Sequence, residues 1–166
     1  MEYLEVRPVE ESDYDFILSV NEKNVEVLAP MDKEKLINFI EIASLFCVAV
    51  INGKRAAFLI ALTEDASSYE SENYCWFSKH YKHFLYVDRI VIDEQYRKKG
   101  LGRILYQKVF QHAKLHNIPV VTAEIDTIPF NEASLKFHKV MGFEEVGTQY
   151  VRGGRIQVSL QAAEVE

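Results

Sequence analysis

The sequence has few of the features that mark secreted, membrane or disulfide-stapled proteins. Its 166 residues include only two cysteines, Cys47 and Cys75, too few for a disulfide framework and typical of a reducing compartment. It has no run of about 18 apolar residues, so no membrane-spanning segment is predicted. The N-terminal stretch has no basic segment followed by an apolar one, which argues against a signal peptide. These absences predict a cytoplasmic protein that does not associate with membranes.

Basic residues are also scarce. There are 19 lysines and arginines against 25 aspartates and glutamates, which gives a formal net charge of -6. A nucleic-acid-binding domain usually carries a basic surplus, so this balance argues against one. Hydrophobic residues make up 48% of the chain, enough for a sizeable core, and no repeat or linker is visible. We therefore expect one globular domain over residues 1–166.

The first third of the chain shows one strand pattern and two helix patterns. Residues 3–9 alternate as a strand does, and the two stretches that follow have apolar residues at helical spacing. Ser12 and Asp32 are the expected N-caps. The apolar stripes are Phe16, Ile17 and Val20 in the first helix, and Leu36, Phe39, Ile40 and Ala43 in the second.

A hairpin is predicted next. The apolar runs "LFCVAVI" (45–51) and "RAAFLIAL" (55–62) flank Asn52-Gly53, a dipeptide that favours the tight turns of antiparallel hairpins. We expect these runs to be neighbouring strands.

Residues 63–83 show neither helical nor strand periodicity and are predicted to form a polar loop. The loop is rich in aromatic residues, and long loops are often functional. Two interpretations remain open: a surface excursion packed on its own aromatic cluster, or a lip that binds substrate. The aromatic residues are Tyr69, Tyr74, Trp76, Phe77 and Tyr81.

The second half predicts a parallel crossover followed by a hairpin. A strand at 84–92, a helix at about 102–116 and a strand at 118–128 form a right-handed βαβ unit. A helix at 131–141 ends before Gly142, and strands at 144–151 and 155–162 are joined through Gly153-Gly154. The predicted fold is α/β (α+β), with a mixed sheet of about seven strands flanked by about four helices. We expect 155–162 to be an edge strand that could serve as a homodimer contact.

The most distinctive stretch is the turn "RKKGLG", which joins a strand to a helix. Helix starts expose unpaired N–H groups, and glycines there allow close approach of an anion. The spacing matches neither a P-loop nor G-x-G-x-x-G. Two other interpretations are a solvated tight turn and a nucleic-acid patch, and the net charge argues against the latter.

Two motifs resemble those of the GNAT N-acetyltransferase superfamily. Arg-x-x-Gly-x-Gly at Arg97–Gly102 resembles its pyrophosphate-binding signature, and "NEASLKFHKVMGF" (131–143) resembles its second hallmark. The stretches "LYVDRIVI", "EIDTIPFN" and "FHKVMGFEEVG" resemble a bacterial branch of predicted acetyltransferases. The resemblance implies a single domain with a sheet splayed at a cofactor wedge. It also implies direct transfer of an acetyl group from acetyl-CoA to a primary amine.

The resemblance further implies which residues bind acetyl-CoA. The turn and the helix start would hold the diphosphate, and the backbone of the preceding strand would pair with the pantetheine arm and donate to the carbonyl oxygen. The later helix would contribute Asn131, Ser134 or Leu135, and His138 from one face. The cofactor-binding residues are thus Ile90, Val91, Ile92, Arg97, Lys98, Lys99, Gly100, Leu101, Gly102, Arg103, Asn131, Ser134 and His138.

Position 138 departs from the family pattern. The family most often has a tyrosine there, which protonates the CoA thiolate, whereas this chain has His138. An imidazole donates a proton near neutral pH at least as readily as a phenol does. We predict His138 as the acid, with Tyr106 or a water as substitutes. A satisfied structural histidine is the other interpretation.

Carboxylates within apolar strands are candidates for the base, because burying them is costly unless they are paired or functional. Glu124 and Asp126 share a face of their strand. We predict Glu124 as the base, through a water if needed, with Asp88 or Asp126 attracting the cationic amine. Alternatively, Asp88 or Arg89, expected on opposite faces, forms a structural ion pair with Glu124 or Asp126.

Neither a metal ion nor a covalent intermediate is predicted for the reaction. His112 and His116 have the spacing of a helical zinc site, but no further ligand is patterned around them, so no metal is expected. The sequence spacing suggests no adjacent histidine base for Cys47 or Cys75, which argues against an acetyl-cysteine route. The acceptor is expected to be a small-molecule or peptide amine. The alternative function is an acyl-CoA-binding module or sensor that has lost the transfer step.

Overall fold

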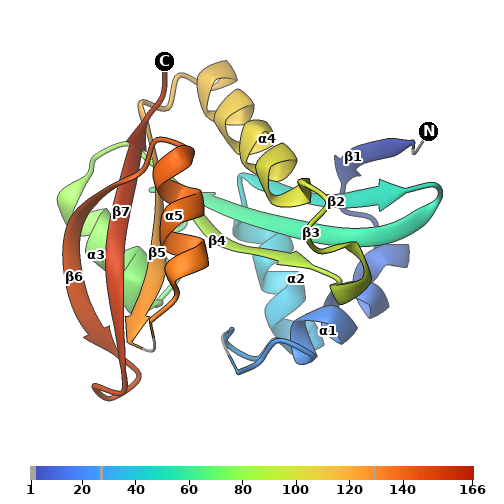
Figure 1. Cartoon of the computed structure of the whole chain (residues 1–166), viewed down its shortest axis with the longest axis horizontal. Coiled ribbons are helices and arrows are strands. Elements are labelled where there is room, and N and C mark those ends of the chain that lie inside the picture. The colour runs from blue at the N-terminus through green and yellow to red at the C-terminus, as the bar shows by residue number, and fades with distance from the viewer. Residues whose placement is uncertain (1–2, 27, 129) are drawn as a thin grey trace. The chain divides into compact units, whose positions relative to one another are not determined.

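The structure is a computed structural model that describes residues 3–26, 28–128 and 130–166. Within these ranges it contains seven strands and five α-helices (Figure 1). The elements are β1 (Leu4–Pro8), α1 (Tyr14–Glu22), α2 (Lys33–Ile42), β2 (Leu45–Ile51), β3 (Lys54–Thr63), α3 (Glu72–His80), β4 (Leu85–Ile92), α4 (Leu101–Leu115), β5 (Val120–Ile128), α5 (Glu132–Val140), β6 (Glu144–Val151) and β7 (Ile156–Glu164).

The strands form one mixed sheet in the order β1-β2-β3-β4-β5-β7-β6. β4 and β5 are parallel and are joined by α4, which confirms the predicted crossover. Their ladder pairs Leu85 with Val121 and Tyr86 with Thr122, at the beginning of both strands. β1–β2, β2–β3, β5–β7 and β6–β7 are antiparallel. The α/β fold with a mixed seven-stranded sheet is therefore confirmed, with one helix more than expected.

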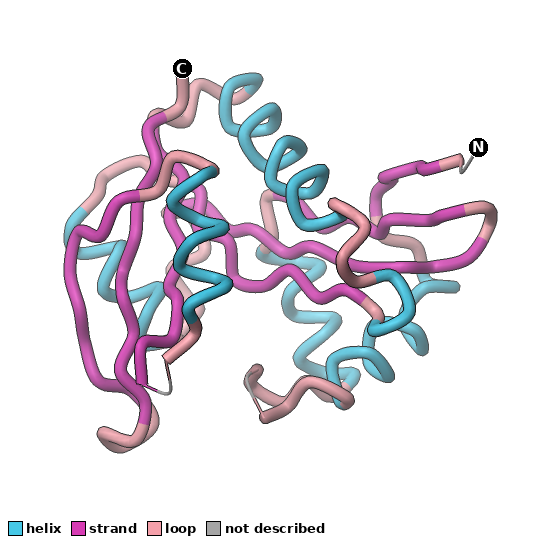
Figure 2. Tube along the Cα trace, viewed as in Figure 1, coloured by secondary structure: helices cyan, strands magenta, loops and turns pink. Residues whose placement is uncertain are grey.

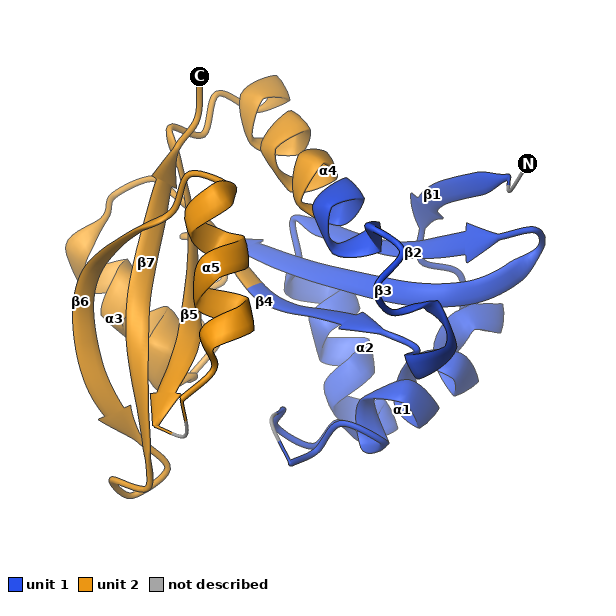
Figure 3. Cartoon of the chain, viewed as in Figure 1, with its two compact units in different colours: residues 1–62, 88–105 blue, residues 63–87, 106–166 orange. Residues whose placement is uncertain are grey.

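The chain divides into two compact units (Figure 3). The first comprises residues 1–62 and 88–105, and the second comprises residues 63–87 and 106–166. Both β4 and α4 contribute residues to each unit. That residues 1–166 form a single domain stays a prediction.

The first unit is built on the β2–β3 hairpin (Figure 2). Asn52 and Gly53 have φ of 50° and 80°, the left-handed conformations that a type I′ turn requires. Asp32 caps α2 by accepting a hydrogen bond from the Lys35 N–H at 2.8 Å, as predicted. The predicted cap at Ser12 is wrong. Ser12 lies within a 3-10 turn, Glu11–Asp13, and Asp13 occupies the N-cap position of α1.

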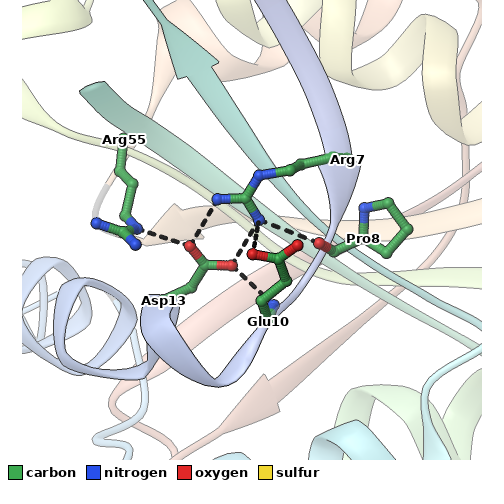
Figure 4. Close-up of polar contacts among 5 residues, drawn as sticks. All are labelled: Arg7, Pro8, Glu10, Asp13 and Arg55. Atoms are coloured by element: carbon green, nitrogen blue, oxygen red, sulfur yellow. Dashed lines mark hydrogen bonds and ion pairs between the residues drawn. The ribbon is translucent and has the colours of Figure 1, made fainter. Parts of the chain in front are cut away.

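Asp13 is fully buried and joins two strands to this turn (Figure 4). Its carboxylate accepts from both terminal nitrogens of Arg7, at 2.8 and 2.9 Å, and from Nε of Arg55 at 2.6 Å. The Glu10 N–H donates a further hydrogen bond at 2.8 Å. Such a carboxylate is stable when buried because two cations and a backbone donor compensate its charge.

The second unit places α3 and α5 on opposite faces of β5, β7 and β6 (Figure 1). α3 lies within the segment predicted to be a loop, so that prediction is wrong. Ser71 caps α3, and its side chains Tyr74 and Phe77 are buried. Two aromatic residues three positions apart form the core-facing stripe of this short helix. The surrounding polar residues conceal that stripe in the sequence.

The prediction that residues 155–162 form an edge strand is also wrong. β7 lies between β5 and β6, and the sheet ends at β1 and β6. Consecutive hairpin strands need not add to a sheet in chain order, because the second strand of the pair can insert beside β5. A homodimer contact through an edge formed by β7 is therefore excluded.

In the described ranges, no helix is both long enough and apolar enough to cross a membrane.

Candidate active site

The glycine turn precedes α4 in the first unit. Lys98 and Gly100 have φ of 64° and 77°, so two left-handed residues reverse the chain before the helix. The Ile104 N–H bonds to the Gly100 carbonyl at 3.2 Å, which makes Gly100 the residue before the first helical position. In an α-helix the N–H groups of the first turn have no acceptor within the helix. The amides of Leu101, Gly102 and Arg103 thus belong to the first turn of α4, and that they bind a diphosphate stays a prediction.

The basic side chains of the turn differ in their contacts. Arg97 donates to Asn24 Oδ1 at 2.8 Å and to the Ile92 carbonyl at 3.3 Å. The Lys99 ammonium lies 5.6 Å from the centre of the Tyr96 ring. Arg97 thus ties the turn to the rest of the first unit. That Arg97, Lys98 and Lys99 contact a diphosphate stays a prediction.

Asp88 forms an ion pair with its neighbour Arg89 on β4. The Arg89 Nε lies 2.6 Å from Asp88 Oδ2, and both side chains are almost completely buried. Arg89 also donates to Asn21 Oδ1 at 2.8 Å and to the Ala29 carbonyl at 3.1 Å. That Asp88 and Arg89 point to opposite faces of the strand stays a prediction, since a long guanidinium side chain can reach the carboxylate of its neighbour. The roles of the Ile90–Ile92 backbone stay predictions.

Tyr106 and His138 form a buried pair in the second unit. The Tyr106 hydroxyl lies 2.7 Å from His138 Nε2, and the two side chains are 5% and 9% exposed. His138 Nδ1 lies 2.7 Å from the Ser134 carbonyl. A carbonyl only accepts, so Nδ1 carries the proton in the neutral ring and Nε2 accepts from Tyr106. Helical spacing between Ser134 and His138 fixes this tautomer.

Burial keeps both members of the pair neutral. It lowers the pKa of His138, and the hydrogen bond to the Ser134 backbone offsets this only in part. It raises the pKa of Tyr106, and the negative charge of Glu124 raises it further. The sequence predicted His138 and named Tyr106 as its substitute. The structure brings the two together.

Asn131 is the N-cap of α5. Its Oδ1 accepts from the Ser134 N–H at 3.2 Å, which confirms that it opens the helix. Its predicted contact with pantetheine, and that of Ser134, are not tested by this geometry.

Glu124 is half-buried on β5 and accepts a hydrogen bond from the Tyr86 hydroxyl at 2.5 Å. Two residues on, burial raises the pKa of Asp126, and the nearby Arg152 partly offsets the effect. Tyr86 was missed by the sequence reasoning. The sequence placed Tyr86 in a strand expected beside the strand of Glu124. It did not give the register between the two strands, so it could not predict that these residues meet.

The described residues contain no group of three or more histidine, cysteine or acidic side chains that could hold a metal. Cys47 is buried in β2, and the Cys75 thiol on α3 lies 3.8 Å from the Tyr69 carbonyl. Neither cysteine is in a disulfide bond.

Comparison with known proteins agrees with this geometry. Residues 10–143 match the family model described as "Acetyltransferase (GNAT) family", a range that includes the glycine turn and α5. Among curated proteins, none matches the sequence.

Solved structures show the same fold at low sequence identity. Ard1 from Thermoplasma volcanium has a TM-score of 0.77 at 14% identity, covering 98% of both chains. The ribosomal-protein-S18-alanine N-acetyltransferase from Escherichia coli has a TM-score of 0.74 at 18% identity, covering 99% of this chain and 95% of that one. The yncA structure from Salmonella typhimurium, which holds its cofactor acetyl-CoA, has a TM-score of 0.74 at 17% identity, covering 98% and 94%.

Proposed function

Because the chain belongs to the acetyltransferase (GNAT) family, we propose that it transfers the acetyl group of acetyl-CoA to a primary amine by direct attack in a ternary complex. The acceptor is a small molecule or the amino group of a peptide. The reaction takes place in the cytoplasm, a location favoured by two cysteines that form no disulfide.

One observation carries this proposal: the family match spans a glycine turn that leads directly into helix α4. In such a helix the first-turn amides have no acceptor within the helix. The N–H groups of Leu101, Gly102 and Arg103, with the helix dipole behind them, bind the diphosphate. The lysines of the turn add charge-assisted contacts. The backbone of Ile90–Ile92 pairs with the pantetheine arm and polarises the carbonyl, and Asn131 and Ser134 hold the same arm.

Glu124 removes the proton that the ammonium form of the acceptor carries. Its carboxylate is half-buried and accepts a hydrogen bond from Tyr86. Asp126, on the same face of β5, attracts the cationic acceptor. We assign Asp88 a structural role, because its carboxylate is paired with Arg89 at 2.6 Å.

The Tyr106–His138 pair protonates the departing thiolate. The resting pair is neutral, so His138 first takes up a second proton from solvent in each turnover. Its Nε2–H then donates to the Tyr106 oxygen and leaves the phenolic O–H free to donate to sulfur. The phenolic proton then passes to sulfur while the Nε2 proton passes to the phenol oxygen. The products are a thiol, an intact tyrosine and a neutral histidine, which is the protonation state of the structure. His138 thus acts through Tyr106 in place of the family's tyrosine.

Calorimetry and thiol release test the function in two steps. Acetyl-CoA should bind, and S-acetylpantetheine, which lacks the diphosphate, should bind at least about 100-fold more weakly. Release of CoA thiol should then depend on an amine from a panel of spermidine, tyramine, an aminoglycoside, free amino acids and a peptide with N-terminal alanine. The double variant K98A/K99A should weaken binding, with Lys114→Ala, near the end of α4, as the matched control.

Two results would overturn the proposal. Equal affinity for acetyl-CoA and S-acetylpantetheine would show that the protein has no binding site for the diphosphate. Tight binding of acetyl-CoA without thiol release on any amine, unchanged in His138→Ala, would favour the acyl-CoA sensor instead.

A further inference from the structure

Tyr86 connects the candidate base to a rigid aromatic cluster. Its hydroxyl donates to Glu124 at 2.5 Å, from residue 86 of β4 to residue 124 of β5, which are 38 positions apart in the chain. Tyr86 is paired with Thr122 across the parallel ladder, and Glu124 lies two positions beyond Thr122 on the same face of β5. The ladder thus fixes the distance between the phenol and the carboxylate.

Helix α3 fixes the ring of Tyr86. The Tyr86 side chain is 1% exposed, and its ring centre lies 5.7 Å from those of Tyr74 and Phe77. The Tyr74 hydroxyl donates to the Thr63 carbonyl at 2.6 Å, which anchors α3 at the end of β3. A buried tyrosine packed on two sides has few rotamers available, so its hydroxyl has a defined position.

Ionisable groups from several elements lie near Glu124 or are linked to it. Tyr86 reaches it from β4, Asp126 lies on its own strand, and the charge of Glu124 raises the pKa of Tyr106 on α4. His138 on α5 is bonded to Tyr106. On β7 the residue opposite Glu124 is the apolar Leu160. The Tyr86 hydroxyl donates directly to the carboxylate.

We propose that Tyr86 is a positioning residue for the reaction, which holds the Glu124 carboxylate charged and aimed for removal of the acceptor's proton. This inference rests on the proposed function. An O–H donor favours the charged form of a carboxylate, and fixing one oxygen orients the other. It also gives α3 a role, because the aromatic cluster of Tyr74, Phe77 and Tyr86 supports the base from outside the site. The cluster contains no catalytic residue.

The test compares two tyrosine-to-phenylalanine variants. Tyr86→Phe removes the hydroxyl bonded to Glu124, and Tyr74→Phe removes a hydroxyl of the same cluster that bonds to Thr63 instead. Both keep the rings, so both lose one buried hydrogen bond and little packing. Thiol release is followed against pH with acetyl-CoA and the fastest amine among spermidine, tyramine and the alanine peptide. Urea unfolding checks that each variant is folded.

Tyr86→Phe should move the acidic limb of kcat/KM to higher pH by about one pH unit, which lowers kcat/KM about tenfold at a fixed pH on that limb. Tyr74→Phe should leave the limb in place, whatever its effect on stability. Glu124→Gln should abolish the limb. Limbs that coincide in wild type, Y86F and Y74F would overturn the proposal.

An infrared titration separates this inference from the proposed function. The difference spectrum between wild type and E124Q reports the carboxylate of Glu124 without any substrate. Its midpoint should be higher by about one pH unit in Y86F and unchanged in Y74F. A shifted midpoint in a protein that acetylates no amine would refute the transferase and keep the contact. An unshifted midpoint in an active enzyme would refute the role of Tyr86 alone.

Discussion

Asp13 is a fully buried carboxylate of the first unit, and its charge is compensated by Arg7 and Arg55. Burial alone raises the pKa of its carboxyl, but the hydrogen bonds from Arg7 and Arg55 outweigh burial and lower the pKa to about 2. Because the folded pKa lies below that of the unfolded chain, 3.8, this stabilisation is complete above pH 3.8 and is lost as pH falls through 2. Asp13 therefore contributes acid sensitivity to the fold.

We expect Asp13→Asn to lower the free energy of unfolding by about 3 kcal/mol at pH 7, because two buried guanidinium groups lose their counter-charge. The difference from wild type should shrink by about 2 kcal/mol between pH 5 and pH 2. Urea unfolding measures both quantities. Asp15→Asn, an exposed carboxylate of α1, should change stability by less than about 0.5 kcal/mol. A difference that stays constant with pH would contradict the prediction.

His138 predicts a second pH dependence. Its pKa is lowered in the folded protein, so below pH 6.5 the unfolded chain binds more protons than the folded one. The stability linked to His138 is therefore complete above pH 6.5 and falls as the pH drops. Wild type should lose more stability between pH 7 and pH 5 than His138→Gln does, as measured by urea unfolding. His116→Gln, an exposed histidine after α4, should behave like wild type; if it matched H138Q instead, the assignment would be wrong.

The sequence could not predict the hydrogen bonds of the site that join residues far apart in the chain. His138 and Ser134 are four positions apart on one helix, and their contact follows from helical spacing. Tyr106 and His138 are 32 positions apart, and Tyr86 and Glu124 are 38 apart. Such contacts depend on strand register and helix packing, which composition and periodicity do not fix. The motifs predicted residue identities and left the hydrogen bonds among them open.

Elements with strong local signals were predicted, and elements defined by tertiary packing were not. The Asn52-Gly53 turn, the Asp32 cap and the Asn131 cap all depend on neighbouring residues and are all present. Helix α3 shows little periodicity, since only Tyr74 and Phe77 are buried in it. The place of β7 in the sheet depends on pairing with β5, a contact between segments far apart in the chain. Both errors concern non-local interactions.

The packing of α3 on β6 gives a prediction at Gly147. A Cβ added there would lie 2.5 Å from Cζ2 of Trp76, whose ring is stacked on His80 at 3.7 Å between centres. The ring is held in place, so Gly147→Ala should lower the free energy of unfolding by about 1–3 kcal/mol. Urea unfolding should show no comparable loss for Thr148→Ala, on the exposed next position. Phenylalanine has a smaller ring than tryptophan, so Gly147→Ala should cost less stability in the W76F variant than in wild type. Equal costs in the two backgrounds would contradict the contact.

The whole chain combines a negative net charge with a local basic turn, and this combination favours our proposal of a coenzyme diphosphate over a nucleic-acid partner. The formal net charge is -6, and the basic run is confined to residues 97–103. A long polyanion contacts an extended basic surface, whereas a diphosphate needs one helix start and a few cations. The match to the acetyltransferase (GNAT) family over residues 10–143 agrees with a diphosphate as the anion.

Ligand binding should therefore stabilise the whole protein. A ligand that binds only the folded state at 100 times its Kd adds about 2.7 kcal/mol, which for a chain of this size raises Tm by about 5–10 °C. We expect this shift with acetyl-CoA at low salt, a smaller one with S-acetylpantetheine at the same concentration, and none with duplex DNA. Differential scanning calorimetry measures all three. Equal shifts from both thioesters would show that the affinity comes from the pantetheine arm, and the amides of α4 would then have no part in binding the diphosphate.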